Sequence, residues 1–350
     1  MARGTGQLAA VAVFAAAALA LISSLGPQPR LNEPDRQRAE VAGVQSQSNW
    51  TEFAPKLKSN SEIGIAQVNN LVFVVGGYPS TRRYEDTVEV YDATTDSWQF
   101  APPLPQAMHH TMAVGINGKV YVIGGEISTT GLADQGIYLD TVYEFDPLNP
   151  GWTQKSSMPT QRSAGAWGII DGKVYVAGGR PPHGNDFAAY DPVADSWSAL
   201  PDLPTQRNHL AAGAIEGKLY VAGGRFGGGV GSEMTAILEV FDPGTNTWER
   251  RAPMPTARGG VNGIAVNGCL YTFGGEGNDD HPLGVFDQTE VYNPRTDTWA
   301  SLEPIPVPVH GVTGLAYVDG WIHLPGGGIM RGGSSGTTLH QAFRAHLSCE

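Results

Sequence analysis

The sequence predicts an all-β fold, a six-bladed β-propeller with four-stranded blades. Two observations support this prediction. The chain has 350 residues, of which 46 are Gly and 25 are Pro, and both residues disfavour the interior of a helix. In addition, a unit of about 50 residues recurs six times, and repeats of this length that each supply a few short strands are typical of propeller blades.

Four features mark the repeat, and they recur in phase. Tryptophans set its period: Trp50, Trp98, Trp152, Trp197, Trp248 and Trp299. Glycine pairs are Gly76-Gly77, Gly124-Gly125, Gly178-Gly179, Gly223-Gly224, Gly274-Gly275 and the variant Pro325-Gly326-Gly327. A turn dipeptide precedes each pair: Asn69-Asn70, Asn117-Gly118, Asp171-Gly172, Glu216-Gly217, Asn267-Gly268 and Asp319-Gly320. Aromatic-Asp or aromatic-Asn pairs follow: Tyr91-Asp92, Phe145-Asp146, Tyr190-Asp191, Phe241-Asp242 and Tyr292-Asn293.

Each unit contains four short strands in a fixed order. In the second copy, a first apolar run covers residues 111–116, and a second covers residues 120–123 after the Asn117-Gly118 turn. Asn-Gly between two such runs is a strong short-range signal for a β-hairpin. A third strand follows a variable loop, as at residues 88–91 of the first copy, and an Asp-x-x-Thr-Asp-Ser turn leads into the outer Trp strand.

A family resemblance is clearest in the fifth copy. Its segments MPTARGGVNGIAVNGCLYTFGGE (residues 254–276) and EVYNPRTDTW (residues 290–299) resemble the kelch repeat. The resemblance covers about residues 50–350 and implies a six-bladed kelch β-propeller. Exported bacterial-type kelch proteins, including the sialic acid mutarotase (N-acetylneuraminate epimerase) group, are a looser match in length, architecture and compartment.

The repeat units cover about residues 50–97, 98–151, 152–196, 197–247, 248–298 and 299–350. The last copy has three strands and no Trp strand, whereas residues 50–53 form a Trp strand that precedes the first complete copy. We therefore expect residues 50–53 to complete the last blade and close the ring, which removes open sheet edges. Since one blade cannot bury its faces alone, residues 50–350 are predicted to form a single domain.

The N-terminal segment predicts export. Residues 8–22 contain no polar residue and follow a short basic stretch, so residues 1–26 are interpreted as a signal peptide or signal anchor. Residues 27–49 are polar and predicted to be a disordered linker. The folded part is expected outside the cytoplasm, periplasmic or secreted, with a membrane attachment only if the N-terminal segment is uncleaved.

Net charge and cysteine content limit the possible binding partners, disulfides and zinc sites. The formal net charge of −12 argues against nucleic acid as a partner, because it repels a polyanionic backbone. Cys269 and Cys349 permit one disulfide at most, and two unpaired thiols are the favoured interpretation, since well-oriented pairs are rare. The sequence contains no CxxC motif and no Cys/His spacing typical of a zinc site.

Candidate ligand-binding residues lie where the copies differ. The loop into a blade's first strand and the loop after Gly-Gly should open on one face, where Arg and His gather despite the acidic composition. Arg guanidinium groups bind carboxylates and phosphates well, so this face is predicted to bind an anion. The predicted ligand-binding residues are His109, His110, Arg162, Arg180, Arg207, Arg225, Arg258 and His310. Because Arg162, Arg207 and Arg258 recur at one repeat position, a structural role bonding loop carbonyls is the alternative for these three.

Three functions remain open from the sequence. The first is recognition of an anionic small molecule, a glycan or a protein partner, without a cofactor. The second is a cofactor-independent carbohydrate-acid isomerase, as the looser resemblance implies, with Glu62, Glu126, Glu276 and His209 as candidate catalytic residues. The third is a metal enzyme whose ligands are drawn from His109, His110, His209 and His310.

Overall fold

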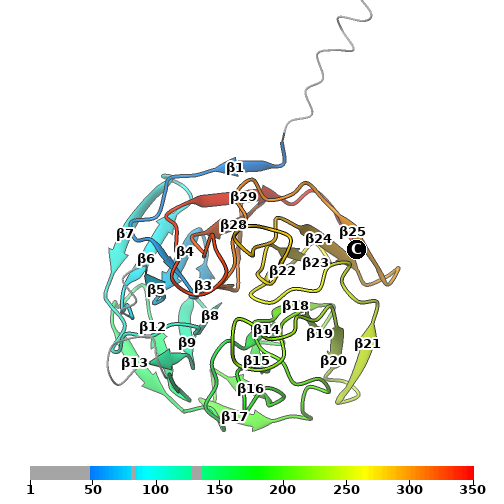
Figure 1. Cartoon of the computed structure of the whole chain (residues 1–350). Helices are drawn as coiled ribbons and strands as arrows, with labels where there is room; N and C mark the ends of the chain where they lie inside the picture. Colours follow the sequence, from blue (N-terminus) through cyan, green and yellow to red (C-terminus); the bar gives the residue numbers. More distant parts are fainter. Residues whose placement is uncertain (1–47, 80–83, 128–135) are drawn as a thin grey trace, which may run out of the picture. The chain divides into compact units, whose positions relative to one another are not determined.

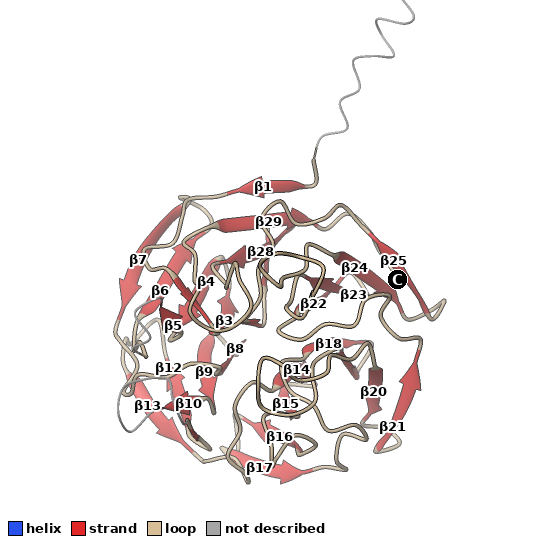
Figure 2. Ribbon diagram, in the orientation of Figure 1, coloured by secondary structure: helices blue, strands red, loops and turns tan. Residues whose placement is uncertain are grey.

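Six antiparallel sheets are arranged around a central axis in the computed structural model, which describes residues 48–79, 84–127 and 136–350 (Figure 1). Each sheet is one blade, and the innermost strands lie nearest the axis. The described residues contain strands, turns and loops but no helix (Figure 2). The predicted six-bladed β-propeller with four-stranded blades is therefore confirmed.

The blades are listed here from the innermost strand outward. Blade 1 contains β3 (Ile63–Val68), β4 (Leu71–Val75), β6 (Val88–Asp92) and β7 (Ser97–Ala101). Blade 2 contains β8 (Met112–Ile116), β9 (Lys119–Ile123), β12 (Val142–Phe145) and β13 (Trp152–Lys155). Blade 3 contains β14 (Ala166–Ile170), β15 (Lys173–Ala177), β16 (Phe187–Asp191) and β17 (Ser196–Ala199).

Blade 4 contains β18 (Ala211–Ile215), β19 (Lys218–Ala222), β20 (Leu238–Asp242) and β21 (Thr247–Arg251). Blade 5 contains β22 (Asn262–Val266), β23 (Cys269–Phe273), β24 (Thr289–Asn293) and β25 (Thr298–Ser301). Blade 6 contains β27 (Ala316–Val318), β28 (Trp321–Pro325), β29 (His340–Arg344) and β1 (Trp50–Glu52). Five short strands lie outside this pattern: β2 (Asn60–Ser61), β5 (Tyr78–Pro79), β10 (Glu126–Ile127), β11 (Ile137–Tyr138) and β26 (Val312–Thr313).

The tight turns between the first two strands of each blade follow the predicted hairpin chemistry. The first turn residue has φ between 48° and 54° in every copy: Asn69, Asn117, Asp171, Glu216, Asn267 and Asp319. This left-handed conformation is what a two-residue hairpin turn requires, and a Gly follows in five copies. The turn dipeptides thus set the pairing register of the two inner strands.

The N-terminal strand closes the ring, as predicted. β1 pairs antiparallel with β29, and Trp50 lies opposite Phe343. The Trp50 side chain is 7% exposed, and its Nε1 donates to the Glu303 carbonyl at 3.1 Å. Its ring centroid lies 5.1 Å from that of Phe343 and 5.7 Å from that of Phe273 in blade 5. A short strand, β26 (Val312–Thr313), also pairs in parallel with β3 and joins the last copy to blade 1. The two ends of the propeller are therefore joined in two places, by β1 in blade 6 and by β26 on blade 1.

The two cysteines form a disulfide, so the favoured interpretation of unpaired thiols was wrong. Cys269 begins β23 in blade 5, and its sulfur is bonded to that of Cys349 at 2.04 Å. The Cys349 amide also donates to the Asn267 carbonyl at 2.9 Å. The two residues are 80 positions apart, and the disulfide joins the C-terminal segment that follows blade 6 to blade 5.

The described residues include no helix long and apolar enough to cross a membrane. The predicted signal segment, residues 1–26, and all but the last two residues of the predicted linker, residues 27–49, lie outside the described part of the chain. Residues 48–350 make up one compact unit.

Candidate functional site

One residue in each blade adopts a left-handed backbone just before the innermost strand. Their φ values lie between 52° and 69°, and they are Glu62, His110, Ala164, His209, Gly260 and Gly311. Backbone hydrogen bonds link neighbouring members, including His110 N to Glu62 O at 2.9 Å and His209 N to Ala164 O at 2.8 Å. The conformation is common to all six blades, so the fold requires it. The side chains at these positions differ, and they determine the chemistry.

Two further repeat positions lie beside the left-handed residues. The residue before each left-handed position is Ser61, His109, Ser163, Asn208, Gly259 or His310, and the residue after each glycine pair includes Glu126, Arg180, Arg225 and Glu276. Backbone bridges join the two positions, for example His109 with Glu126 and Asn208 with Arg225. We name nine of these residues the polar cluster: Glu62, His109, His110, Glu126, Arg180, His209, Arg225, Glu276 and His310.

His110 lies at the centre of the polar cluster. Its Nε2 is 3.0 Å from Glu62 Oε2, 3.1 Å from His209 Nε2 and 3.1 Å from Arg180 Nη2. Its Nδ1 contacts Nδ1 of His109. The structure therefore brings together side chains from blades 1, 2, 3 and 4, which are far apart in the sequence.

Two ion pairs flank this centre. Arg225 pairs with Glu276, and its Nη2 lies 3.0 Å from His209 Nε2. Arg180 Nε lies 3.3 Å from Glu126 Oε2, which also accepts a hydrogen bond from Ser163 at 3.2 Å. Each of these guanidinium groups is therefore already paired with a carboxylate of the cluster. The predicted surplus of positive charge is compensated in part within the site.

Asn208 was not among the predicted site residues, although it fixes His209 in place. Its Oδ1 lies 2.5 Å from His209 Nδ1, and its Nδ2 donates to the Gly227 carbonyl at 2.7 Å. The amide is thereby oriented with its oxygen toward the imidazole, which places the proton on Nδ1 and leaves Nε2 of His209 as an acceptor. Its repeat position, shared with His109 and His310, was the signal that could have identified it.

His310 occupies a different environment. Its Nε2 lies 2.8 Å from the Met330 carbonyl, and its Nδ1 lies 3.6 Å from Glu62 Oε1 and 3.9 Å from Glu276 Oε2. Among the described residues Nδ1 has no hydrogen-bond partner. Gly311 makes room for this arrangement, since a Cβ there would lie 2.8 Å from the Glu62 carboxyl group.

Burial and neighbouring charges together control the protonation states of the polar cluster. Burial alone would raise the pKa of Glu62, but His110, His310 and Arg225 together hold it far below its ordinary value, so Glu62 is ionised. Burial lowers the pKa of His209 well below its ordinary value, and the nearby Arg225 lowers it further. Burial likewise lowers the pKa of His109. These two imidazoles are therefore neutral at neutral pH.

Three of the predicted ligand-binding arginines lie elsewhere. Arg162, Arg207 and Arg258 are 0% exposed. Arg207 pairs with Glu239, Arg258 pairs with Glu290 at 2.8 Å, and Arg162 donates to the carbonyls of residues 176 and 186 at 2.8 and 2.9 Å. Their guanidinium groups hold blades and loops together and have no surface with which to contact a ligand. This placement fits the alternative of a structural role at a shared repeat position.

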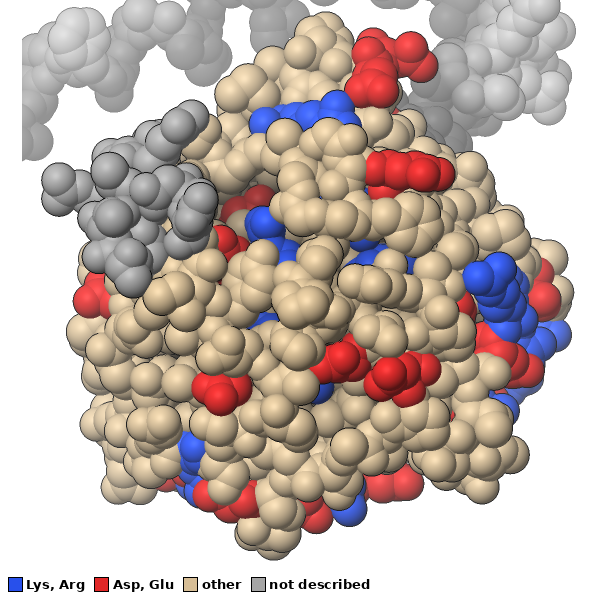
Figure 3. Space-filling view, turned by 60° about the horizontal axis from the view of Figure 1, so that its bottom comes forward, with Lys and Arg blue, Asp and Glu red and all other residues tan. Residues whose placement is uncertain are grey.

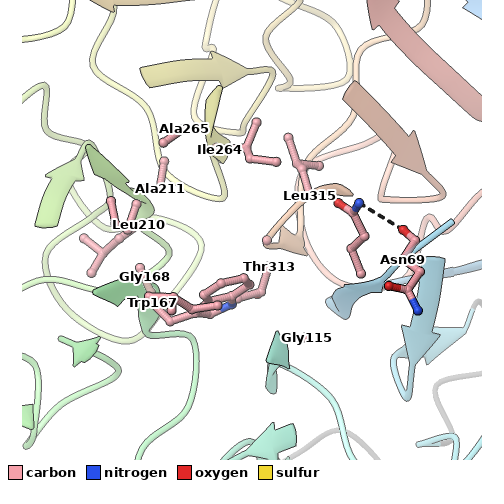
Figure 4. Close-up of a pocket in the computed structure, with 18 residues that line it drawn as sticks. Asn69, Gly115, Trp167, Gly168, Leu210, Ala211, Ile264, Ala265, Thr313 and Leu315 are labelled. Carbon is pink, nitrogen blue, oxygen red and sulfur yellow. Dashed lines mark hydrogen bonds between the residues drawn. The ribbon is translucent and has the colours of Figure 1, made fainter. Parts of the chain in front are cut away.

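A separate cavity of about 370 Å³ lies along the axis and is lined mainly by the innermost strands. Its wall is mostly glycine and small apolar residues, and the ring of Trp167 lies within it (Figure 4). Trp167 Nε1 has no hydrogen-bond partner among the described residues. The repeat pattern does not show this cavity, because its wall forms only where the innermost strands of different blades meet.

The molecular surface in Figure 3 is dominated by uncharged residues, and several Lys or Arg side chains are recessed between them. Arg180 and Arg331 are the more accessible basic groups near the cluster, with side chains 15% and 28% exposed. Both lie near enough to Arg225 to lower its pKa, although burial is the larger cause of that shift. The accessible part of the site is therefore guanidinium-rich.

Comparisons with known proteins agree with this architecture. Residues 43–224 match the KLHDC2/KLHL20/DRC7 Kelch-repeats domain, and residues 206–255 and 257–306 each match the Kelch motif. The chain is 32% identical to "Kelch-like protein terF" of Aspergillus terreus, over 82% of this chain and 64% of that protein. It is 24% identical to "Beta-scruin" of Limulus polyphemus, over 78% of this chain and 25% of that protein. It thus spans less than two thirds of either relative's length.

Among solved structures, the one titled "Structure of YjhT" matches with a TM-score of 0.68 at 16% sequence identity, covering 82% of this chain and 95% of that one. At this identity the likeness shows a shared fold. The family match covers half of the chain, and the six blades with their repeated turns are consistent with it. This chain belongs to the kelch-repeat family.

Proposed function

We propose that this protein is an exported kelch propeller that binds an anionic small molecule or an acidic glycan at the polar cluster. Kelch propellers in general serve as binding modules, and a fold alone does not determine the ligand. The observation that carries the proposal is the presence of two partly exposed guanidinium groups at the accessible edge of the site. The side chains of Arg180 and Arg331 are 15% and 28% exposed, although Nε of Arg180 already contacts Glu126 Oε2 at 3.3 Å.

A ligand carboxylate could accept hydrogen bonds from these two guanidinium groups without breaking the Arg225–Glu276 pair below them. Carboxylates and imidazoles beside them supply acceptors and donors for ligand hydroxyl groups. An acidic sugar offers both a carboxylate and hydroxyl groups. This combination favours it over a simple inorganic anion.

The first test is a thermal-shift screen of acidic sugars against Arg180→Gln. A ligand present at 100 times its Kd should add about 2.7 kcal/mol to the free energy of unfolding of the unsubstituted protein. We expect Arg180→Gln to lose most of this gain, because the accessible cation is gone. Arg295→Gln is the matched control, since Arg295 lies in the turn between β24 and β25, is 58% exposed and pairs with Glu216 of the turn between β18 and β19. Equal stabilisation of both variants by every ligand would refute the proposed site, and stabilisation by a protein partner alone would favour the protein-binding alternative.

A second candidate function is cofactor-independent isomerisation of an acidic sugar. Opening a hemiketal requires a base for the anomeric hydroxyl proton and an acid for the ring oxygen. The cluster supplies an ionised Glu62 at 3.0 Å from His110, and a neutral His209 whose tautomer is held by Asn208. Either group can accept the anomeric hydroxyl proton and, once protonated, return it to the ring oxygen, while Glu126 and Glu276 are engaged mainly in ion pairs.

Exchange spectroscopy between the two anomers of sialic acid tests this candidate. The protein should increase the exchange rate, and Glu62→Gln should reduce that increase by about 10²-fold or more, the usual contribution of a positioned acid or base. Glu249→Gln is a control, since Glu249 lies on the outer strand β21 and pairs with Arg251. If the unsubstituted protein leaves the exchange rate unchanged, the isomerase candidate is wrong, whereas the binding proposal is still tested by the thermal-shift screen.

Two observations support the proposed export. Residues 8–22 form an uninterrupted apolar run, and the chain contains a disulfide between Cys269 and Cys349. Disulfides form and persist mainly in oxidising compartments such as the periplasm or the cell exterior. A periplasmic or secreted location accounts for both features.

A further inference from the structure

We propose that Glu62, His110 and His209 form a binding site for one divalent transition-metal ion. The inference goes beyond the proposed function and does not depend on it. Oε2 of Glu62 and Nε2 of His209 lie 3.0 and 3.1 Å from Nε2 of His110, and the three residues have donor atoms within 4.8 Å of one another. Metal bonds to such ligands are about 2.0–2.2 Å long, so ligand atoms around one ion lie about 3 Å apart.

The two imidazoles are oriented as metal ligands usually are. Each presents Nε2 toward the other, and each has its Nδ1 held from behind, by Asn208 Oδ1 for His209 and by His109 Nδ1 for His110. A hydrogen bond from the second ring nitrogen commonly fixes the tautomer and orientation of a metal-binding histidine. The propeller fold itself does not require this pairing, because the equivalent left-handed residues in blades 3, 5 and 6 are Ala164, Gly260 and Gly311.

Charge supplies an independent argument. The Glu62 carboxylate is buried, and among the described residues no Lys or Arg lies within 4.0 Å of it. The other two carboxylates of the cluster, Glu126 and Glu276, each have an arginine partner. Two histidines and the more distant Arg225 favour the charged form of Glu62, and a divalent ion bound directly to the carboxylate would compensate its charge more fully.

The neighbouring guanidinium groups are compatible with an ion. Nη2 of Arg180 lies near Nε2 of His110, and Nη2 of Arg225 lies near Nε2 of His209. Each arginine is also held by a carboxylate, Arg180 by Glu126 and Arg225 by Glu276. These arginines would stand beside an ion held by three protein ligands. Three ligands leave a coordination position open, and the two cations beside it favour an anion there.

The donor set indicates the class of metal. Two imidazoles and one carboxylate suit Zn²⁺, Fe²⁺, Co²⁺ or Ni²⁺, whereas Mg²⁺ and Ca²⁺ prefer oxygen ligands throughout. This inference modifies the expectation of a protein without a cofactor. Of the four histidines considered for a metal from the sequence, it uses His110 and His209 and adds Glu62.

The test is a Co²⁺ and Zn²⁺ titration of the full chain after dialysis against a chelator, with no sugar present. We expect saturable binding of about one ion per chain, and a Co²⁺ absorption spectrum with bands more intense than those of the hydrated ion. Glu62→Gln and His209→Asn should each weaken binding at least tenfold, since even the loss of an outer-shell partner costs 10–100-fold. His183→Gln is the control, because His183 pairs with Asp186 outside the cluster.

The proposal is overturned if the unsubstituted protein shows no saturable binding, or if neither Glu62→Gln nor His209→Asn weakens it. Unchanged binding in both variants together with a loss in Glu126→Gln would assign the ion to the neighbouring group of His109, His110 and Glu126 instead. Far-ultraviolet circular dichroism confirms the folding of each variant. If one variant does not fold, the other variant and the Co²⁺ spectrum of the unsubstituted protein decide. Since no sugar is present, a negative result here leaves the thermal-shift test of anion binding unaffected.

Discussion

Trp50→Ala should reduce the free energy of unfolding by about 3–5 kcal/mol, the usual cost of truncating a buried aromatic side chain. Trp50 packs against Phe343 of its own blade and Phe273 of blade 5, and its Nε1 donates to the Glu303 carbonyl. The strand that carries it is the one strand of blade 6 that comes from the N-terminal side of the chain. The substitution therefore weakens ring closure as well as local packing, and chemical denaturation measures the loss.

Trp299→Ala is the matched control for this prediction. Trp299 occupies the same repeat position in blade 5, and its Nε1 also donates to a carbonyl, that of Ala252 at 2.8 Å. It is only partly buried and lies in a blade formed by one continuous segment. We expect a clearly smaller loss for Trp299→Ala. Equal losses at the two positions would show that closure adds nothing to the role of the Trp strand.

Cys349→Ser should cost about 2–4 kcal/mol of stability under oxidising conditions. The Cys269–Cys349 disulfide closes a loop with a sequence separation of 80 residues, and it ties the C-terminal segment that follows β29 to blade 5. Without it the unfolded chain gains conformational freedom. The segment then retains the hydrogen bond from the Cys349 amide to the Asn267 carbonyl and those that the Leu347 carbonyl accepts from Asn267 and Tyr271. Thermal and denaturant unfolding of the variant measure the effect.

A reducing agent provides the control for the disulfide prediction. Reduced unsubstituted protein should unfold at the same denaturant concentration as Cys349→Ser, and the reducing agent should not affect the variant. If reduction leaves the stability of the unsubstituted protein unchanged, the disulfide does not stabilise the fold.

Much of the candidate site could be predicted from the repeat alone. Aligning the copies in phase identified Glu62, His110, His209 and Arg225 as residues that differ between blades at a shared face. The repeat set Arg207 apart from Arg180, because Arg207 shares its repeat position with Arg162 and Arg258, but it did not show which of these arginines a ligand can reach. In the structure Arg207 is fully buried against Glu239, whereas Arg180 stays partly accessible. Which arginine is exposed depends on how neighbouring blades and loops pack.

The sequence by itself determined the blade count, the hairpin turns and the closing role of residues 50–53, because each depends on short-range patterns that recur along the chain. Only the tertiary structure decided the Cys269–Cys349 disulfide and the contacts of the polar cluster. These depend on residues from different blades meeting at one point, such as Glu62 and His209 around His110. A repeat pattern specifies the structure within each unit, whereas the ring geometry determines which side chains of different units come into contact.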